Sequence, residues 1–150
     1  MGPAFAFDKA AGQRCRNLAP DNRCTVHDRL AKAGFSGCVA YDCLGAGQRA
    51  TALFIEGPGW QVEAEALARV DDGFRGLRQV HEALAMLRAA GRLALPEVEE
   101  ARRQALIGAL DAGRDWSLED LAQARARDGV LDEVRGFIAG LRDIKGLRPE

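Results

Sequence analysis

The sequence predicts a mainly α-helical protein in two parts. Residues 1–60 are expected to form a small, irregular, cysteine-rich module with short strands, and residues 61–150 an antiparallel bundle of about four helices. Glycine, cysteine and turn-forming residues are concentrated in the first part, whereas apolar residues recur every three or four positions in the second. The segment Glu56-Gly-Pro-Gly-Trp60 disfavours both helix and strand, so it is the expected domain boundary.

In the cysteine-rich part, one helix and two strands are predicted. Thr25-Val-His-Asp28 has the spacing of a capping box and should open a helix through Ala33, with Gly34 as its left-handed stop. The short apolar run Cys38-Val-Ala-Tyr-Asp-Cys43 is expected to be a strand or a knuckle, and Thr51-Ala-Leu-Phe-Ile55 a second strand.

Two long helices are expected between residues 61 and 110. Gly73 and Gly76 should weaken the first helix without ending it, and Pro96 suits the first turn of the second. The apolar face of the first helix comprises Leu67, Val70, Phe74, Leu77, His81 and Leu84, and that of the second Val98, Ala101, Ala105, Ala109 and Leu110.

Two further helices are expected after residue 116. Ser117 is the predicted N-cap of the first, with Asp120 at its third position, and Trp116 is placed to pack against Leu121. Short connections favour antiparallel packing of neighbouring helices. The last helix follows Asp128-Gly129, and its predicted buried face comprises Val130, Val134, Phe137, Ile138, Leu141 and Ile144.

Composition excludes several classes of protein. The chain has 150 residues, 47% of them hydrophobic, which suffices for one domain or two small cores. Lys+Arg 21 against Asp+Glu 22 leaves a formal charge of -1, so there is no overall basic field to attract nucleic acid or an anionic membrane. No apolar run approaches the ~20 residues of a membrane span, and the first residues do not resemble a signal peptide. We therefore expect a cytoplasmic protein with neither nucleic acid nor membrane as a partner.

The four cysteines and one histidine gather in a single short segment. Thiolate and imidazole are the ligands that zinc and iron prefer, and four of them can complete a tetrahedral shell. Their spacing is not that of a standard zinc finger, so the prediction depends on their density. The candidate ligands of a zinc or iron ion, or less favourably of an iron–sulfur cluster, are Cys15, Cys24, His27, Cys38 and Cys43.

Other interpretations of these residues remain open. In a reducing compartment the thiols can instead be redox-active, or can pack as small hydrophobic side chains. His27 can be a surface or outer-shell residue rather than a ligand. Cys24, ahead of a predicted helix and three residues from His27, can also form the thiolate–imidazolium pair of a cysteine enzyme.

The cysteine-rich segment resembles the zinc- or iron-chelating cysteine-cluster domain of YkgJ type, in which similar motifs recur in the same order. The motifs that carry the resemblance are Arg14-Cys-Arg-Asn-Leu18, Arg23-Cys-Thr-Val-His27, Gly37-Cys38 and Tyr41-Asp-Cys43. They match the second half of that domain, and the cysteine cluster that usually precedes them in the family has no counterpart here. The resemblance implies a metal site. Either the start of this sequence is internal to a longer natural protein, or this chain keeps a reduced site of four ligands.

The first third of the chain also resembles the head region of bacterial pentapeptide-repeat-containing proteins. The matching segments are Phe7-Asp-Lys-Ala-Ala-Gly12, Gly34-Phe-Ser-Gly-Cys38 and Tyr41-Asp-Cys-Leu-Gly-Ala-Gly-Gln48. No pentapeptide repeat occurs in the chain, so the resemblance does not imply the quadrilateral repeat helix that mimics DNA.

The remaining motifs point away from catalysis. Gly45-Ala-Gly-Gln-Arg-Ala50 fits a dinucleotide fingerprint only superficially, and His81 on an apolar face is expected to be a hydrogen-bonded packing residue. The chain has two serines, of which Ser117 is explained as a cap. We therefore favour a non-enzymatic metal-binding module that presents a surface to a protein partner, with a thiol redox protein or a cysteine enzyme as the alternative.

Overall fold

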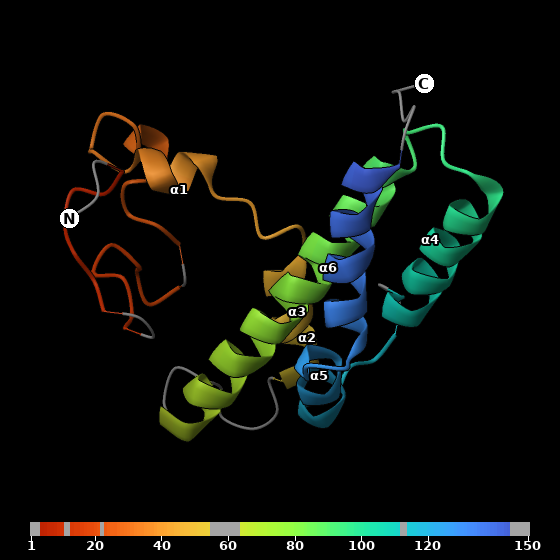
Figure 1. Ribbon diagram of the computed structural model, residues 1–150. Coiled ribbons are helices and arrows are strands. Elements are labelled where there is room, and N and C mark those ends of the chain that lie inside the picture. The colour runs from red at the N-terminus through yellow and green to blue at the C-terminus, as the bar shows by residue number, and fades with distance from the viewer. Residues whose placement is uncertain (1–3, 11–12, 22, 55–63, 112–113, 145–150) are drawn as a thin grey trace. The chain divides into compact units, whose positions relative to one another are not determined.

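The computed structural model describes residues 4–10, 13–21, 23–54, 64–111 and 114–144. The fold is mainly helical (Figure 1), and the chain divides into two compact units, Met1–Asp42 and Cys43–Glu150. Within the described ranges there is no strand, and the β-structure consists of one isolated antiparallel bridge between Leu18 and Cys24. The predicted break at 56–60 lies outside the described residues.

The first unit, Met1–Asp42, contains two short helical elements, the 3-10 helix η1 (His27–Arg29) and the helix α1 (Ser36–Ala40). The prediction of a capped helix from Thr25 is wrong, because the Thr25 hydroxyl donates to the Asn17 carbonyl (3.2 Å) instead of capping a helix. Gly34 does adopt the predicted left-handed conformation, with φ +82°.

Of the two alternatives predicted for Cys38–Cys43, the strand is wrong, because residues 38–40 belong to α1. A short apolar run has no periodicity that separates a strand from a buried helical turn. The first unit therefore retains its irregular character but lacks the expected strands within its described residues.

The second unit begins earlier than the sequence pattern suggests. Helix α2 (Ala46–Phe54) packs against α3 (Ala64–Ala90), so residues 46–54 pack with the bundle, whereas the sequence pattern places the boundary near residue 60. The strand predicted at 51–55 is therefore wrong for 51–54, which are helical. Ala46 and Ala50, one turn apart and both buried, form the contact face of α2.

Helix α3 is the centre of the second unit and contacts four other helices, α2, α4 (Glu97–Leu110), α5 (Leu118–Arg125) and α6 (Val130–Gly140). The 3-10 helix η2 (Leu141–Asp143) follows α6. Figure 1 shows α6 alongside α3. The buried core comprises Ala46, Ala50, Leu77, Val80, Ala83, Leu84, Leu87, Ala90, Leu106, Leu110, Trp116, Leu121, Ala124, Leu131, Val134 and Phe137.

Gly73 and Gly76 lie within α3 without ending it, as predicted. Gly76 allows a close approach of α5, since a Cβ at this position would lie 3.1 Å from the Cβ of Leu121. The loss of helix propensity at Gly76 is therefore compensated by packing between helices.

The predicted buried face of α4 is correct for Leu110 and wrong for its other four residues. Val98 is 77% exposed, and Ala101, Ala105 and Ala109 are exposed as well. The buried residues are Arg103, Leu106 and Leu110. Two leucines one turn apart bury more apolar area than a row of alanines, and this difference decides the rotation of the helix.

Arg103 is buried at 8% exposure on this face of α4. Its Nη1 donates to the carbonyl of Leu87 (3.0 Å) near the end of α3, and its Nη2 lies 2.6 Å from Glu100 Oε1. The hydrogen bonds from Arg103 and Gln104 lower the pKa of Glu100 to about 2. A charged side chain is thus tolerated in the packed face because its donors are satisfied.

The start of α5 confirms the predicted capping box. Ser117 Oγ accepts from the Asp120 amide (3.1 Å), and Asp120 Oδ2 accepts from the Ser117 amide (3.0 Å). Trp116 and Leu121 are both buried in the same core. In α6, Val134 and Phe137 are buried as predicted, together with Leu131, which the predicted face omits.

Replacing Ser117 by alanine should lower the free energy of unfolding by about 1 kcal/mol, because the Asp120 amide loses its acceptor and the Asp120 carboxylate loses the Ser117 hydroxyl. Urea unfolding followed by circular dichroism measures the change. Asp115→Ala, at an exposed position just before the helix, is the matched control. Equal losses in the two variants would contradict a role for the cap.

Candidate metal centre

Two tight turns position Cys15 and Cys24 in the first unit. The Leu18 amide donates to the carbonyl of Cys15 (3.1 Å), and the His27 amide donates to that of Cys24 (3.3 Å). Each cysteine therefore begins a turn closed by the amide three residues later.

The chain doubles back between the two turns. The Ala19 amide donates to the Arg23 carbonyl (2.9 Å), and the Thr25 amide donates to the Asn17 carbonyl (2.8 Å). These bonds flank the bridge between Leu18 and Cys24. Backbone pairing thus holds the segments that carry Cys15 and Cys24 together.

The N-terminal segment anchors α1, which carries Cys38. The Ala4 carbonyl accepts from the Gly37 amide (2.9 Å), and a Cβ at Gly37 would lie 2.3 Å from the Phe5 ring. Phe35, just before α1, is buried and meets the edge of the Phe7 ring at a centroid distance of 5.3 Å. Only glycine at position 37 permits this close packing.

The thiols of Cys15 and Cys24 are close enough to Cys38 to influence its ionisation. Burial raises the pKa of Cys38, and the negative charges of Cys15 and Cys24 raise it further. All four cysteines lie in the described ranges, and each is a free thiol. Across these ranges, however, no group of three or more Cys, His, Asp or Glu side chains is arranged so that it could hold a metal ion. The three sulfurs are gathered, but they are not preformed as a coordination shell.

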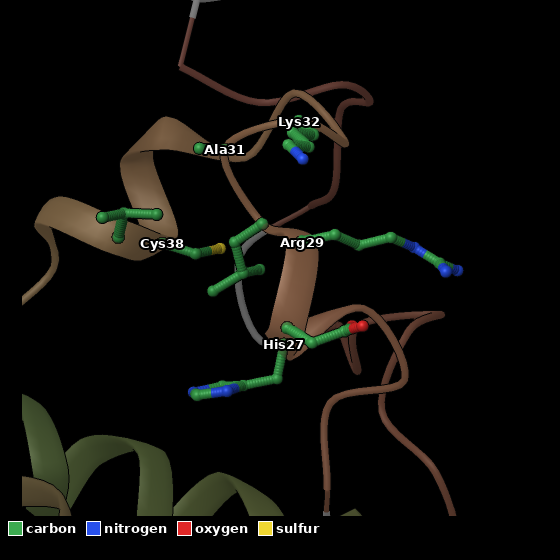
Figure 2. Close-up of a pocket in the computed structure, with 8 residues that line it drawn as sticks. His27, Arg29, Ala31, Lys32 and Cys38 are labelled. Atoms are coloured by element: carbon green, nitrogen blue, oxygen red, sulfur yellow. The ribbon is translucent and has the colours of Figure 1, made fainter.

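His27 and Cys38 border the same open pocket of ≈ 480 Å³ (Figure 2). Figure 2 shows the Cys38 thiol extending from α1, the His27 ring at the start of η1, and Arg29 pointing away. His27 is exposed, so its ring can change rotamer freely. The pocket is lined by His27, Asp28, Arg29, Leu30, Ala31, Lys32, Cys38 and Val39.

Cys43, the fifth predicted ligand, is the first residue of the second unit. Its Sγ lies 3.6 Å from Gln48 Oε1 and 3.6 Å from the position that a Cβ on Gly47 would occupy. Its local environment is thus the first turn of α2. Its membership of a metal site remains a prediction from the sequence.

His81 has the hydrogen bond expected of a packing residue. Its Nδ1 lies 2.6 Å from the Leu44 carbonyl. Leu44 (φ 54°) and Gly45 (φ 87°) both have left-handed backbone conformations at this point. The glycine-rich segment 45–50 enters α2 directly, and no strand precedes it in the described residues. The dinucleotide interpretation therefore has no support.

Comparison with known proteins reveals one informative similarity. The chain is 42% identical over 86 residues to the Bacillus subtilis (strain 168) protein described as "Uncharacterized protein YybG". The alignment covers 57% of this chain and 31% of that protein, so the chain spans about a third of its relative's length. No family model matches the chain, and no solved structure is significantly similar. In the described residues, no helix has the length and apolar character required to cross a membrane.

Proposed function

We propose that the first unit is a non-enzymatic metal-binding module that takes up one zinc or iron ion. Cys15, Cys24 and Cys38 are its proposed ligands, with His27 or Cys43 in the fourth position. The observation that carries the proposal is the proximity of Cys15 and Cys24, each at the start of a turn, to Cys38 on α1, whose pKa their charges raise. A divalent cation would remove the repulsion between their thiolates, because metal coordination requires and stabilises the deprotonated form.

The composition of the first unit supports this proposal. Among its described residues, Phe35 is the one buried hydrophobic side chain. Small domains without a sufficient apolar core usually require a metal, disulfides or a partner for stability. The cysteines are free, and a metal ion can supply the missing free energy when its site closes during binding. A site that closes around its ion is consistent with three thiols that lie in one unit without being arranged as a coordination shell.

The resemblance to YkgJ-type cysteine clusters supports the choice of zinc or iron. The part of that family's motif that this sequence contains supplies the cysteines and the histidine of the proposed site. A reducing cytoplasm would keep its thiols available for metal. We further propose that the bound ion holds the first unit in the shape that a protein partner recognises.

The alternative is a thiol redox protein or a cysteine enzyme that uses Cys24 and His27. The turn that joins these two residues, through the His27 amide and the Cys24 carbonyl, keeps them close in the chain. A raised pKa at Cys38 disfavours that thiol as a nucleophile, because the thiolate is the reactive form. Alkylation rates distinguish the two functions.

The purified chain should carry about one zinc or iron ion per molecule. Its cysteines should alkylate slowly and uniformly at neutral pH, and faster only after chelation. Elemental analysis and mass-resolved alkylation, on the same sample before and after chelator, measure both properties. A colourless protein that contains zinc would identify a zinc site, whereas visible absorbance would indicate an iron–sulfur cluster. Metal-free protein with one fast thiol that ignores the chelator would favour the redox alternative.

Chelation should disorder the first unit and leave most of the helical circular dichroism, because the core of α2–α6 lies within the second unit. Amide hydrogen exchange should then rise in residues 13–42 while α3 stays protected. Parallel loss of protection in α3 would mean that metal binding stabilises the whole fold.

A further inference from the structure

Another pocket lies within the second unit. It has a volume of ≈ 310 Å³ and is bordered by the end of α4, by α5 and by the start of α6. This volume is within the range of small-molecule sites. Its lining comprises Ala109, Arg114, Trp116, Asp120, Gln123, Ala124 and Val130.

Trp116, which lines this pocket, is 3% exposed. Its indole Nε1 is fully buried and has no hydrogen-bond partner among the residues that the structure describes. A buried indole N–H normally donates to an acceptor, since leaving it unpaired costs free energy. The core explains the burial of the Trp116 ring but provides no acceptor for its nitrogen.

Arg114 adds a positive charge beside the same ring. Its guanidinium carbon lies 4.7 Å from the Trp116 ring centroid, and its Nη2 lies 2.7 Å from Asp120 Oδ1. The other oxygen of Asp120 accepts from the amide and the hydroxyl of Ser117. The capping box and Arg114 thus already engage both oxygens of this carboxylate.

We propose that this pocket binds a small carboxylate with a short hydrocarbon part. The ligand carboxylate pairs with the guanidinium of Arg114, and it accepts from the buried Trp116 Nε1 as the side chains that cover this atom move aside. Ala109, Ala124 and Val130 contact its hydrocarbon part. An acceptor that enters beside the Trp116 ring thus supplies what the folded chain lacks, and a charged acceptor pairs with Arg114 more strongly than a neutral one.

Butyrate is the probe, with butyramide and chloride as matched controls for its charge and its shape. The chain has two tryptophans, so the Trp60→Phe variant assigns the Trp116 indole signal in a 1H–15N spectrum. We expect a saturable shift of this signal with butyrate and at least about 10-fold weaker binding of butyramide. Arg114→Gln should weaken butyrate binding by a similar factor, whereas Arg125→Gln, whose Nη1 lies 3.4 Å from Asp72, should not.

The proposal fails if butyrate leaves the indole signal in place, if the shift grows linearly with concentration, or if butyramide and chloride shift it equally. It also fails if Arg114→Gln, shown by circular dichroism to be folded, binds butyrate as the parent does. An unchanged indole signal would mean that butyrate does not reach Trp116 Nε1. None of these outcomes depends on metal bound to the first unit.

Discussion

Replacing Cys24 by serine is expected to weaken zinc binding by more than about 100-fold. Loss of an outer-shell partner alone costs about 10–100-fold in metal affinity, and loss of a directly coordinating thiolate costs more. Cys24 is the most informative position, because it lies both in the bridge to Leu18 and at the start of the turn to His27. Competition with a chromophoric chelator measures the affinity. Amide exchange in residues 13–42 reports whether the first unit still becomes ordered.

Asp28→Asn is the control for this substitution, since Asp28 borders the same pocket as Cys38 but is not a proposed ligand. Its affinity should stay close to that of the parent. If Cys24→Ser and Asp28→Asn bind zinc equally well, the proposed site is wrong. His27→Gln and Cys43→Ser, measured in parallel, identify the fourth ligand, because only the true ligand should match the loss seen with Cys24→Ser.

Replacing Leu87 by alanine should destabilise the second unit by about 2–5 kcal/mol. Leu87 is 0% exposed on α3, so truncation removes apolar contacts and leaves a cavity that the packed helices cannot fully close. Chemical denaturation should show a lower midpoint with an unchanged slope. The helical signal reports this unit, because α2–α6 lie within it.

Met86→Ala is the matched control, adjacent on the same helix and 43% exposed. Its effect should stay within about 0.5 kcal/mol, because an exposed side chain loses little on truncation. A loss at Met86 as large as at Leu87 would mean that this face of α3 is covered in solution. The second unit would then make a contact at this face of α3 in addition to the contacts within its own core.

The candidate site was only partly predictable. Cysteine density identifies Cys15, Cys24 and Cys38, and the structure gathers these three thiols in one unit. The sequence did not indicate how Cys15 and Cys24 are held, because the bridge at Leu18 depends on hydrogen bonds between backbone atoms, which carry no side-chain signal. The pocket beside Trp116 was missed for a related reason. Its lining residues come from three helices and a loop, so they are far apart in the sequence and form no motif.

Local chemistry by itself determined several elements of this protein. The capping box at Ser117 and Asp120 formed as predicted, because both residues act within one turn of their own helix. Gly34 took its left-handed conformation for the same reason, since only the local backbone is involved. The long periodic pattern of α3 also outweighed two glycines, because many apolar contacts along one helix exceed the propensity cost of each.

Only the tertiary structure decided the identity of short or ambiguous segments. Residues 51–54 are apolar enough for a strand, and they are helical because Ala46 and Ala50 of the same helix pack against α3. In α4, both the alanine row and the leucine pair fit a helical face. The leucines are buried because they fill more of the space beside α3 and α6, while Arg103 satisfies the carbonyl of Leu87. Periodicity specifies that a helix has a buried face, but the volume and hydrogen-bonding groups of its neighbours select which face it is.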